Sequence, residues 1–165
     1  MQSNNRFCIL FIESRNLTSS SIFDNDPERY GPQNLITGSY YSFIGPYFKS
    51  KKEDFPWVQW KLPRTINMEG ITLVGRDCPS KSSDCPVLRD IEIRAGKSII
   101  DDNYSGIIKE NELCGSFQGP GNEGGIYTIK CNAKISADVI TVQLKDDDSV
   151  LHISSMNIEK DQDGE

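Results

Sequence analysis

Short apolar runs with a period of two are the feature of this sequence that most restricts its fold. In Ile91-Glu92-Ile93-Arg94, apolar side chains alternate with charged ones, so a strand places the two kinds on opposite faces. Residues typical of turns fill the intervals between such runs. The pattern predicts antiparallel sheets with one face in water and contains no long amphipathic helix. The expected strands are Phe7–Ile12, Trp57–Leu62, Ile71–Val74, Leu88–Arg94, Ile126–Lys130, Val139–Leu144 and Leu151–Ile158.

The number and spacing of these runs predict the architecture. About seven or eight strands joined by several long loops favour a two-sheet jelly-roll sandwich over a compact barrel. We expect a single domain over residues 1–165, with its body at 6–159 and a polar tail at 160–165. A short helical turn is expected at Pro32–Ile36, and a solvated turn at Asp146–Asp148.

The chain has five cysteines, which is enough for two disulfides. Cys78 and Cys85 flank a short polar loop, whereas Cys114 and Cys131 flank a glycine-rich turn and a strand. Neither pair has the CxxC spacing that is typical of zinc sites. The simplest arrangement joins 78 to 85 and 114 to 131. It leaves Cys8, which is either a free thiol in the first strand or a link between chains.

The cellular location is suggested by modification motifs. N-glycosylation sequons begin at Asn16 and Asn103, and together with the loop-closing cysteines they favour an oxidising compartment. We therefore expect a secreted protein, or the extracellular face of a membrane protein. No apolar run approaches the roughly 20 residues of a membrane-spanning helix. Phe7–Ile12 is also too short for a signal-peptide core, and we interpret it as a strand.

Charge and composition argue against several functions. The formal net charge of −6 disfavours nucleic acids and anionic membrane surfaces as partners. The one locally basic stretch, Lys49–Lys52, is interpreted as a solvated loop. The only histidine, His152, lies in an alternating run, where we expect a strand residue with a satisfied imidazole. Since no Ser/His/Asp or Cys/His arrangement is evident, we predict that the protein is not an enzyme.

Several segments resemble motifs of one fold family in the same order. Leu35-Ile36-Thr37-Gly38 is similar to an Ala-x-Asp-Gly turn, Pro56–Leu62 to a Pro-Trp-Trp-x-Val-Asp-Leu strand, and Leu88–Gly96 to a Leu-x-x-x-Glu-Ile-Arg-x-Gly strand. Cys114 to Cys131, followed by Asn132, resembles a late Cys-to-Cys-Asn segment. The chain thus resembles the galactose-binding-like β-sandwiches, which include discoidin and factor V/VIII C-type domains, and especially the F-type lectins (fucolectins). The resemblance implies an all-β jelly roll of two antiparallel sheets with about eight strands.

The resemblance also implies a ligand site on the loops at one end of the sandwich. F-type lectins bind fucose with a histidine before the Pro-Trp strand, an Arg-x-Asp motif and a second basic residue. The cationic donors hold sugar hydroxyls. Here the matching positions carry other residues or an altered spacing, which predicts a diverged sugar site. Its candidate ligand-binding residues are Tyr47, Phe48, Lys49, Arg76, Asp77 and Arg89.

Each of the two arginines has a second interpretation. Arg76 could pair with Asp77, and Arg89 with Asp90, instead of donating to a ligand. The family's calcium site implies a further set of candidates, Asn34, Thr37, Ser39 and Ser155. Thr37 and Ser155 stand where the family has carboxylates, and their loss weakens a site for a hard cation. No cofactor is therefore certain, and Ca²⁺ is the one candidate.

Two functions remain open on this fold. We predict a non-catalytic extracellular recognition module that binds carbohydrate. The alternative is a protein-binding adhesion module that uses the aromatic loop 40–55, because rigid rings serve both paratopes and sugar platforms. The expected partner is accordingly a glycan or a cell-surface protein. The rings of that loop are Tyr40, Tyr41, Phe43, Tyr47, Phe48 and Phe55.

Overall fold

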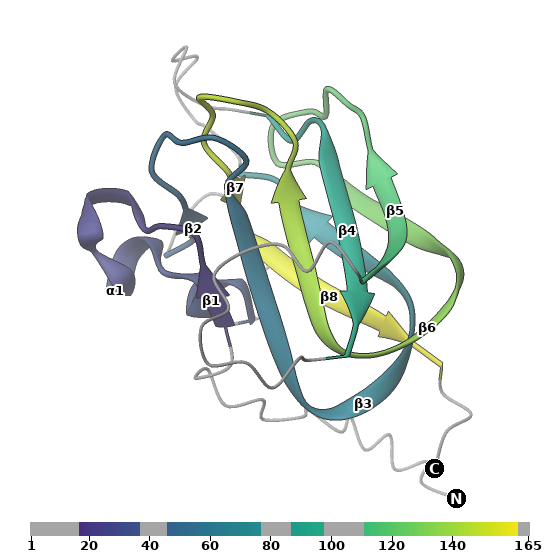
Figure 1. Ribbon diagram of the computed structural model, residues 1–165. Coiled ribbons are helices and arrows are strands. Elements are labelled where there is room, and N and C mark those ends of the chain that lie inside the picture. The colour runs from purple at the N-terminus through teal and green to yellow at the C-terminus, as the bar shows by residue number, and fades with distance from the viewer. Residues whose placement is uncertain (1–16, 37–45, 77–86, 98–110, 162–165) are drawn as a thin grey trace, which may run out of the picture.

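The computed structural model describes residues 17–36, 46–76, 87–97 and 111–161 of the chain. In these ranges the protein is built from strands, with a few short helices at one side (Figure 1). None of the helices described is long and apolar enough to cross a membrane. The elements are β1 (Leu17–Ser19), η2 (Phe23–Asn25), α1 (Pro27–Tyr30), η3 (Pro32–Ile36), β2 (Phe48–Lys49), β3 (Trp57–Val74), β4 (Ile91–Gly96), β5 (Glu112–Phe117), β6 (Ile126–Leu144), β7 (His152–Ile153) and β8 (Ser155–Lys160), where η denotes a 3-10 helix.

The two longest strands, β3 and β6, bend together and contribute to both layers. They pair antiparallel, but the register changes between Lys61 and Ile66 and again between Met68 and Gly70. Pro63 lies in the first irregular stretch, where no ladder N–H is needed. The half of β3 before this bend takes part in the strand order β1-β3-β6-β4-β5, and the half after it pairs with β8. Figure 1 shows β3 curving at the lower end of the molecule between these halves.

The core lies between the layers and is made of alternate residues of the strands. In β4, Ile91 and Ile93 are fully buried, while the charged residues that alternate with them are half-buried. Burial of side chains of this size contributes about 1.5–3 kcal/mol each. Trp60 is buried and Trp57 only half-buried, so one of the two indoles belongs to the core. Other core residues are Val58, Leu62, Ile71, Leu73, Ile140, Val142 and Ile153.

The predicted all-β sandwich is confirmed, although several strands begin and end elsewhere. The runs at 57–62 and 71–74 are parts of one strand, β3, and those at 126–130 and 139–144 are parts of β6. Antiparallel pairing continues through the bulges, so the turn-like residues between these runs do not end the strands. The predicted last strand is divided at Ser154 into β7 and β8.

Short elements account for the remaining differences. The helical turn expected at 32–36 is the 3-10 helix η3. The strands β1, β2 and β5 were not expected, because they are too short or too irregular to show alternation. The predicted strand Phe7–Ile12 lies outside the described residues.

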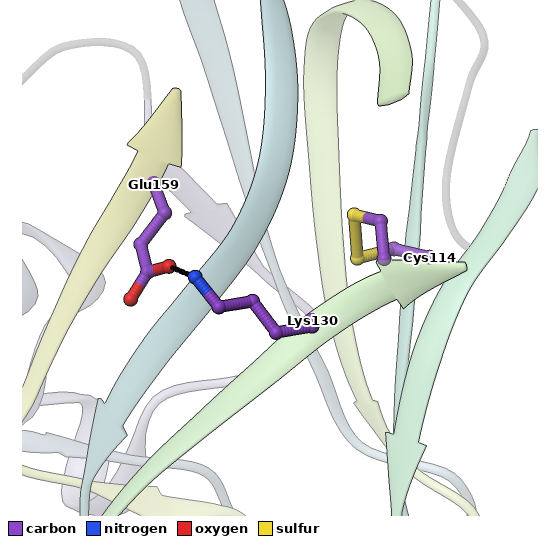
Figure 2. Close-up of a disulfide and its surroundings, with 4 residues drawn as sticks. Cys114, Lys130 and Glu159 are labelled. Carbon is purple, nitrogen blue, oxygen red and sulfur yellow. Dashed lines mark hydrogen bonds and ion pairs between the residues drawn. A yellow bond between two sulfur atoms is a disulfide. The ribbon is translucent and has the colours of Figure 1, made fainter. Parts of the chain in front are cut away.

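A disulfide joins Cys114 of β5 to Cys131 of β6, as predicted (Figure 2). In the pairing of β4 with β5, Ile93 faces Gly115 and the next residue faces Leu113, so Cys114 is an extra residue in β5. Such a bulge turns the side chain away from the regular ladder, and Cys114 is fully buried. The other predicted disulfide, Cys78 to Cys85, lies outside the described residues.

The outer face of the β8-β3-β6 layer carries a polar network. Gly70 of β3 lies in register between Lys130 of β6 and Glu159 of β8. No side chain stands between them, and Lys130 reaches across β3 to form an ion pair with Glu159 (Figure 2). Thr72 Oγ1 donates to Glu159 Oε1 over 3.0 Å and lies 2.9 Å from Thr128 Oγ1. We call Lys130, Glu159, Thr72 and Thr128 the sheet-face network.

Candidate functional site

A two-stranded sheet holds the candidate site at one side of the sandwich. Lys49 of β2 lies opposite His152 of β7, and their neighbours Phe48 and Ile153 form the second pair. Just before β2, the N–H of Tyr47 donates to Arg29 O over 3.2 Å. These bonds fix the backbone of Tyr47 between β7 and the helical segment that contains α1.

The helical segment has a local reason to form. Asp26 accepts a hydrogen bond from the N–H of Arg29 at 3.1 Å, which makes it the N-cap of α1, and Pro27 occupies the first turn. The short helix buries Tyr30 at its end. Asn34 of η3 connects the segment to the site, because its Nδ2 donates to Tyr47 O over 3.4 Å.

Four rings follow one another across these elements. The centroids of Phe23 and Tyr30 are 5.1 Å apart with perpendicular planes, and those of Tyr30 and Tyr47 are 5.3 Å apart. The ring of Tyr47 then lies 4.7 Å from the imidazole of His152. These separations are typical of favourable aromatic contacts. The rings therefore form a continuous row from η2 through α1 to β7.

A cation lies over each of the first three rings. Lys49 Nζ is 3.6 Å from the centroid of the Phe23 ring, and Arg29 Cζ is 5.2 Å from that of Tyr30. Arg76, which lies two residues after the end of β3, brings its Cζ to 3.4 Å from the Tyr47 centroid. Such contacts contribute about 0.5–2 kcal/mol, more when water is excluded. We call the whole set the aromatic–cation ladder, which comprises Phe23, Arg29, Tyr30, Tyr47, Lys49, Arg76 and His152.

His152 is the buried end of the ladder. The residue is only 5% exposed, and neither ring nitrogen has a hydrogen-bond partner within the part of the chain that the structure describes. Burial, together with the smaller effect of the positive charges of Lys49 and Arg76, lowers the pKa of His152 to about 3. The imidazole is therefore neutral at physiological pH, with one nitrogen able to donate and one able to accept. The sequence predicted an imidazole with hydrogen-bond partners, whereas neither nitrogen has one among the described residues.

The phenol of Tyr47 is also kept uncharged. Burial raises the pKa of Tyr47, and this effect outweighs the nearby charge of Arg76, which acts in the opposite direction. The hydroxyl therefore stays protonated at neutral pH. Nearby, Ser154 Oγ is buried without a hydrogen-bond partner among the described residues. The ladder thus combines cations with neutral donors and acceptors.

The structure brings together three of the six predicted ligand-binding residues: Tyr47, Lys49 and Arg76. Phe48 lies in the core beneath them and is fully buried, so its side chain forms packing rather than surface. Arg89 is exposed and pairs with Asp146 at 2.8 Å, not with the aspartate next to it in sequence. Asp77 lies outside the described residues.

The candidate calcium residues are only partly described. Asn34 is buried and uses its amide to hold the carbonyls of Tyr47 and Glu28. Ser155 is buried on β8 opposite Val74. No group of three histidine, cysteine or carboxylate side chains that could hold a metal occurs within the described ranges. The remaining candidates, Thr37 and Ser39 for calcium and Asn16 and Asn103 for glycosylation, lie outside those ranges, as does Cys8.

Four residues of the ladder were not predicted from the sequence: Phe23, Arg29, Tyr30 and His152. The Asp26-Pro27 pair is a helix-start signal that could have located α1 and its Tyr30. No signal in the sequence shows that this segment packs against β2.

His152 also borders a cavity of about 10 Å³, together with Leu88 and other residues. That volume suits about one water molecule, so a larger ligand would lie on the surface of the ladder.

No protein-family model and no curated protein sequence matches the chain. Solved structures match it through their fold. An F-lectin (fucolectin) from the serum of striped bass, Morone saxatilis, is 20% identical, with a TM-score of 0.72. The match covers 89% of this chain and 47% of the bass lectin, so this chain spans about half the length of that protein.

Two further structures are matched over nearly their whole length. The lectin domain of lectinolysin, complexed with Lewis B antigen, is 15% identical with a TM-score of 0.65, and the match covers 88% of this chain and 92% of that domain. The family 32 carbohydrate-binding module of C. perfringens NanJ, in complex with galactose, is 16% identical with a TM-score of 0.59. The match covers 89% of this chain and 96% of that module. The chain therefore has the galactose-binding-like β-sandwich fold that its motifs resemble.

Proposed function

We propose that the protein is a non-catalytic carbohydrate-binding module whose ligand lies on the aromatic–cation ladder. The observation that carries this proposal is the contact of Arg76 with the ring of Tyr47, beside the imidazole of His152, which has no hydrogen-bond partner among the described residues. Support comes from the fold, which this chain shares with a fucolectin and with modules complexed with Lewis B antigen and with galactose.

The chemistry of the ladder suits a sugar. A pyranose offers apolar C–H groups, which pack on rings, and hydroxyls, which both donate and accept hydrogen bonds. Arg76 supplies several N–H donors, and the neutral imidazole of His152 supplies one donor and one acceptor. The resemblance places the histidine of the F-type lectins near Tyr47, Phe48 or Lys49, and His152 of β7 lies opposite Lys49 and against the ring of Tyr47. We propose that His152 takes over the role of that histidine.

The same residues favour binding over catalysis. His152 is buried and neutral, and no hydrogen bond among the described residues links it to a carboxylate or to a nucleophilic hydroxyl. General acid–base chemistry would need such a partner or a pKa near the working pH. We further propose that the protein acts outside the cytoplasm, since the disulfide between Cys114 and Cys131 is typical of oxidising compartments.

A glycan array with two matched variants tests this function. Tyr47→Leu removes the central ring of the ladder, and Phe55→Leu makes the same change at an exposed ring outside it. We expect wild type and Phe55→Leu to bind the same set of glycans, and Tyr47→Leu to lose at least ten-fold in affinity. Absence of any glycan signal from folded wild-type protein would refute the proposal. Capture of a protein ligand through loop 40–55 would then favour the adhesion alternative.

A further inference from the structure

The charge of the ladder differs from that of the chain. The sequence has 24 acidic and 18 basic residues, hence a net charge of −6. The ladder nevertheless gathers Arg29, Lys49 and Arg76 around one row of rings. Arg29 and Arg76 form no ion pair with any carboxylate in the described ranges, although seven other such pairs occur there. The carboxylate of Asp26 accepts a hydrogen bond from the backbone N–H of Arg29 and not from its guanidinium.

Within the described residues, the geometry of Arg76 leaves the N–H donors of its guanidinium available. With Cζ 3.4 Å from the centroid of Tyr47, the guanidinium is in contact with the ring face. A face contact of this kind occupies the π surface, while the N–H groups remain along the edge of the guanidinium. That edge matches the two oxygens of a carboxylate or a sulfate in a bidentate arrangement. Arg76 is half-buried, so water screens such a contact only in part.

His152 supplies a second, independent observation. The residue is only 5% exposed. Its imidazole lies 4.7 Å from the ring of Tyr47 and has no hydrogen-bond partner within the described part of the chain. The positive charges of Lys49 and Arg76 act on this imidazole and oppose its protonation. An anion bound to Arg76 would offset this positive potential, whereas a neutral ligand would leave it in place.

We infer that the ladder selects a sugar residue bearing a carboxylate or a sulfate over the neutral sugar of the same ring stereochemistry. The inference rests on the proposed function and names the class of glycan. Arg76 binds the anionic group through the edge of its guanidinium. Tyr47 holds that guanidinium in place, and His152 bonds to a ring hydroxyl. Carbohydrate binding would survive the loss of this preference, so the two proposals can fail separately.

Matched pairs of sugars test the preference by titration calorimetry. The probes are methyl α-galactoside with its 6-sulfate, methyl α-galactoside with methyl α-galacturonoside, and lactose with its 3′-sulfate. We expect the acidic member of at least one pair to bind ten-fold or more tightly, with an advantage that shrinks as NaCl rises. The chain has one histidine, so its imidazole NMR signals locate the ligand, and we expect them to shift only when a sugar binds at the ladder.

Two arginine variants assign the preference to its residue. Arg76→Gln removes the proposed anion contact, and Arg64→Gln makes the same change of charge at the bend of β3, away from β2 and β7 (Figure 1). We expect the ratio of acidic to neutral affinity to fall below three-fold in Arg76→Gln and to be unchanged in Arg64→Gln. Arg76→Lys keeps the charge without the planar edge. Its ratio of acidic to neutral affinity should lie between those of wild type and Arg76→Gln.

Each contrary result has a separate meaning. Equal or tighter binding of the neutral member in every pair would overturn the acidic preference and leave the proposed function standing. An unchanged ratio in folded Arg76→Gln would overturn the role of Arg76. Competition by sodium sulfate at the concentration of the acidic sugar would show a site for a bare anion and overturn selection of a sugar. Failure of all five sugars, together with an empty glycan array, would overturn both proposals.

Discussion

The sheet-face network and the aromatic–cation ladder are both clusters of charged and polar side chains. They differ in whether a cation contacts a carboxylate or the face of an aromatic ring. On the sheet face, Lys130 has Glu159 as its partner, and Thr72 adds a hydrogen bond to the same carboxylate. In the ladder, Arg76 rests on the ring of Tyr47, and His152 has no hydrogen-bond partner among the described residues.

The difference separates interactions that complete the fold from groups that are still able to bind. The carboxylate of Glu159 already accepts hydrogen bonds from Lys130 and Thr72, so it has few free acceptor positions for a ligand. Buried groups without partners lower the stability of the folded state by about 1–3 kcal/mol each. A ligand that bonds to His152 recovers this loss, and a substitution on the sheet face has no such effect. The comparison therefore predicts that stability and binding can be changed separately.

The largest change in stability without a change in binding is expected at the disulfide beside the sheet-face network. Replacing both Cys114 and Cys131 by alanine opens a link with a sequence separation of 17 residues. The lost restriction of the unfolded chain should lower the free energy of unfolding by about 3 kcal/mol. Urea unfolding measures this loss. Since neither cysteine belongs to the ladder, affinity for the best array glycan should stay within two-fold.

The double variant is preferable to reduction, because a reducing agent would also open the disulfide that the sequence predicts between Cys78 and Cys85. A folded variant that loses its glycan affinity would contradict the separation of stability from binding, since it would show that the sheet face positions the ladder.

The next largest effect is the pH dependence that His152 gives to stability. An imidazole in the unfolded chain has a pKa near 6.5, whereas burial lowers the pKa of His152 in the folded protein to about 3. Between these values the unfolded state binds a proton that the folded state does not, so stability falls as pH decreases through this window. From pH 7 to pH 5 the free energy of unfolding should decrease by about 2 kcal/mol. Urea unfolding at the two pH values checks this.

His152→Phe is the matched variant, because it keeps a ring against Tyr47 and removes the titrating nitrogens. We expect its stability to change by less than about 0.5 kcal/mol between pH 7 and pH 5, and its glycan affinity to fall at least ten-fold. The variant should be no less stable than wild type at pH 7, because it buries no unpartnered nitrogen. A wild-type protein with flat stability over this range would show that His152 is solvated or partnered.

The fold could be predicted from the sequence because alternation is a local signal. Ile91 and Ile93 reveal one buried face of β4 without any knowledge of the neighbouring strands. The lengths of β3 and β6 could not be predicted in this way. Pro63 and the residues around it suggest a turn, but the strand continues because β6 follows the same bend. Cys114 to Cys131 was predictable, since it needed only the spacing of two cysteines around a turn.

The candidate site was predictable only where family motifs give its position. Tyr47, Lys49 and Arg76 were candidates because the resemblance places the F-type lectin histidine near residues 47–49 and the Arg-x-Asp motif near Arg76 and Asp77. Tyr30 does not, because its place in the row depends on how α1 packs against β2. For His152, the strand was predicted but not the environment of the imidazole. Whether a buried ring finds a partner depends on residues that are far away in the sequence.

The smallest expected effect is that of the ion pair on the sheet face. The side chain of Lys130 is 66% exposed, and exposed pairs contribute about 0–1 kcal/mol because water and salt screen them. A double-mutant cycle with Lys130→Gln and Glu159→Gln should therefore give a coupling energy below about 1 kcal/mol, and less in 1 M NaCl. Hydrogen bonding from Lys130 lowers the pKa of Glu159, so the coupling should also be lost as the pH falls below the ordinary glutamate range. Glycan affinity should be the same in all four proteins of the cycle. A coupling that exceeds 2 kcal/mol, or that changes with bound glycan, would mean that the sheet-face network and the aromatic–cation ladder are not independent.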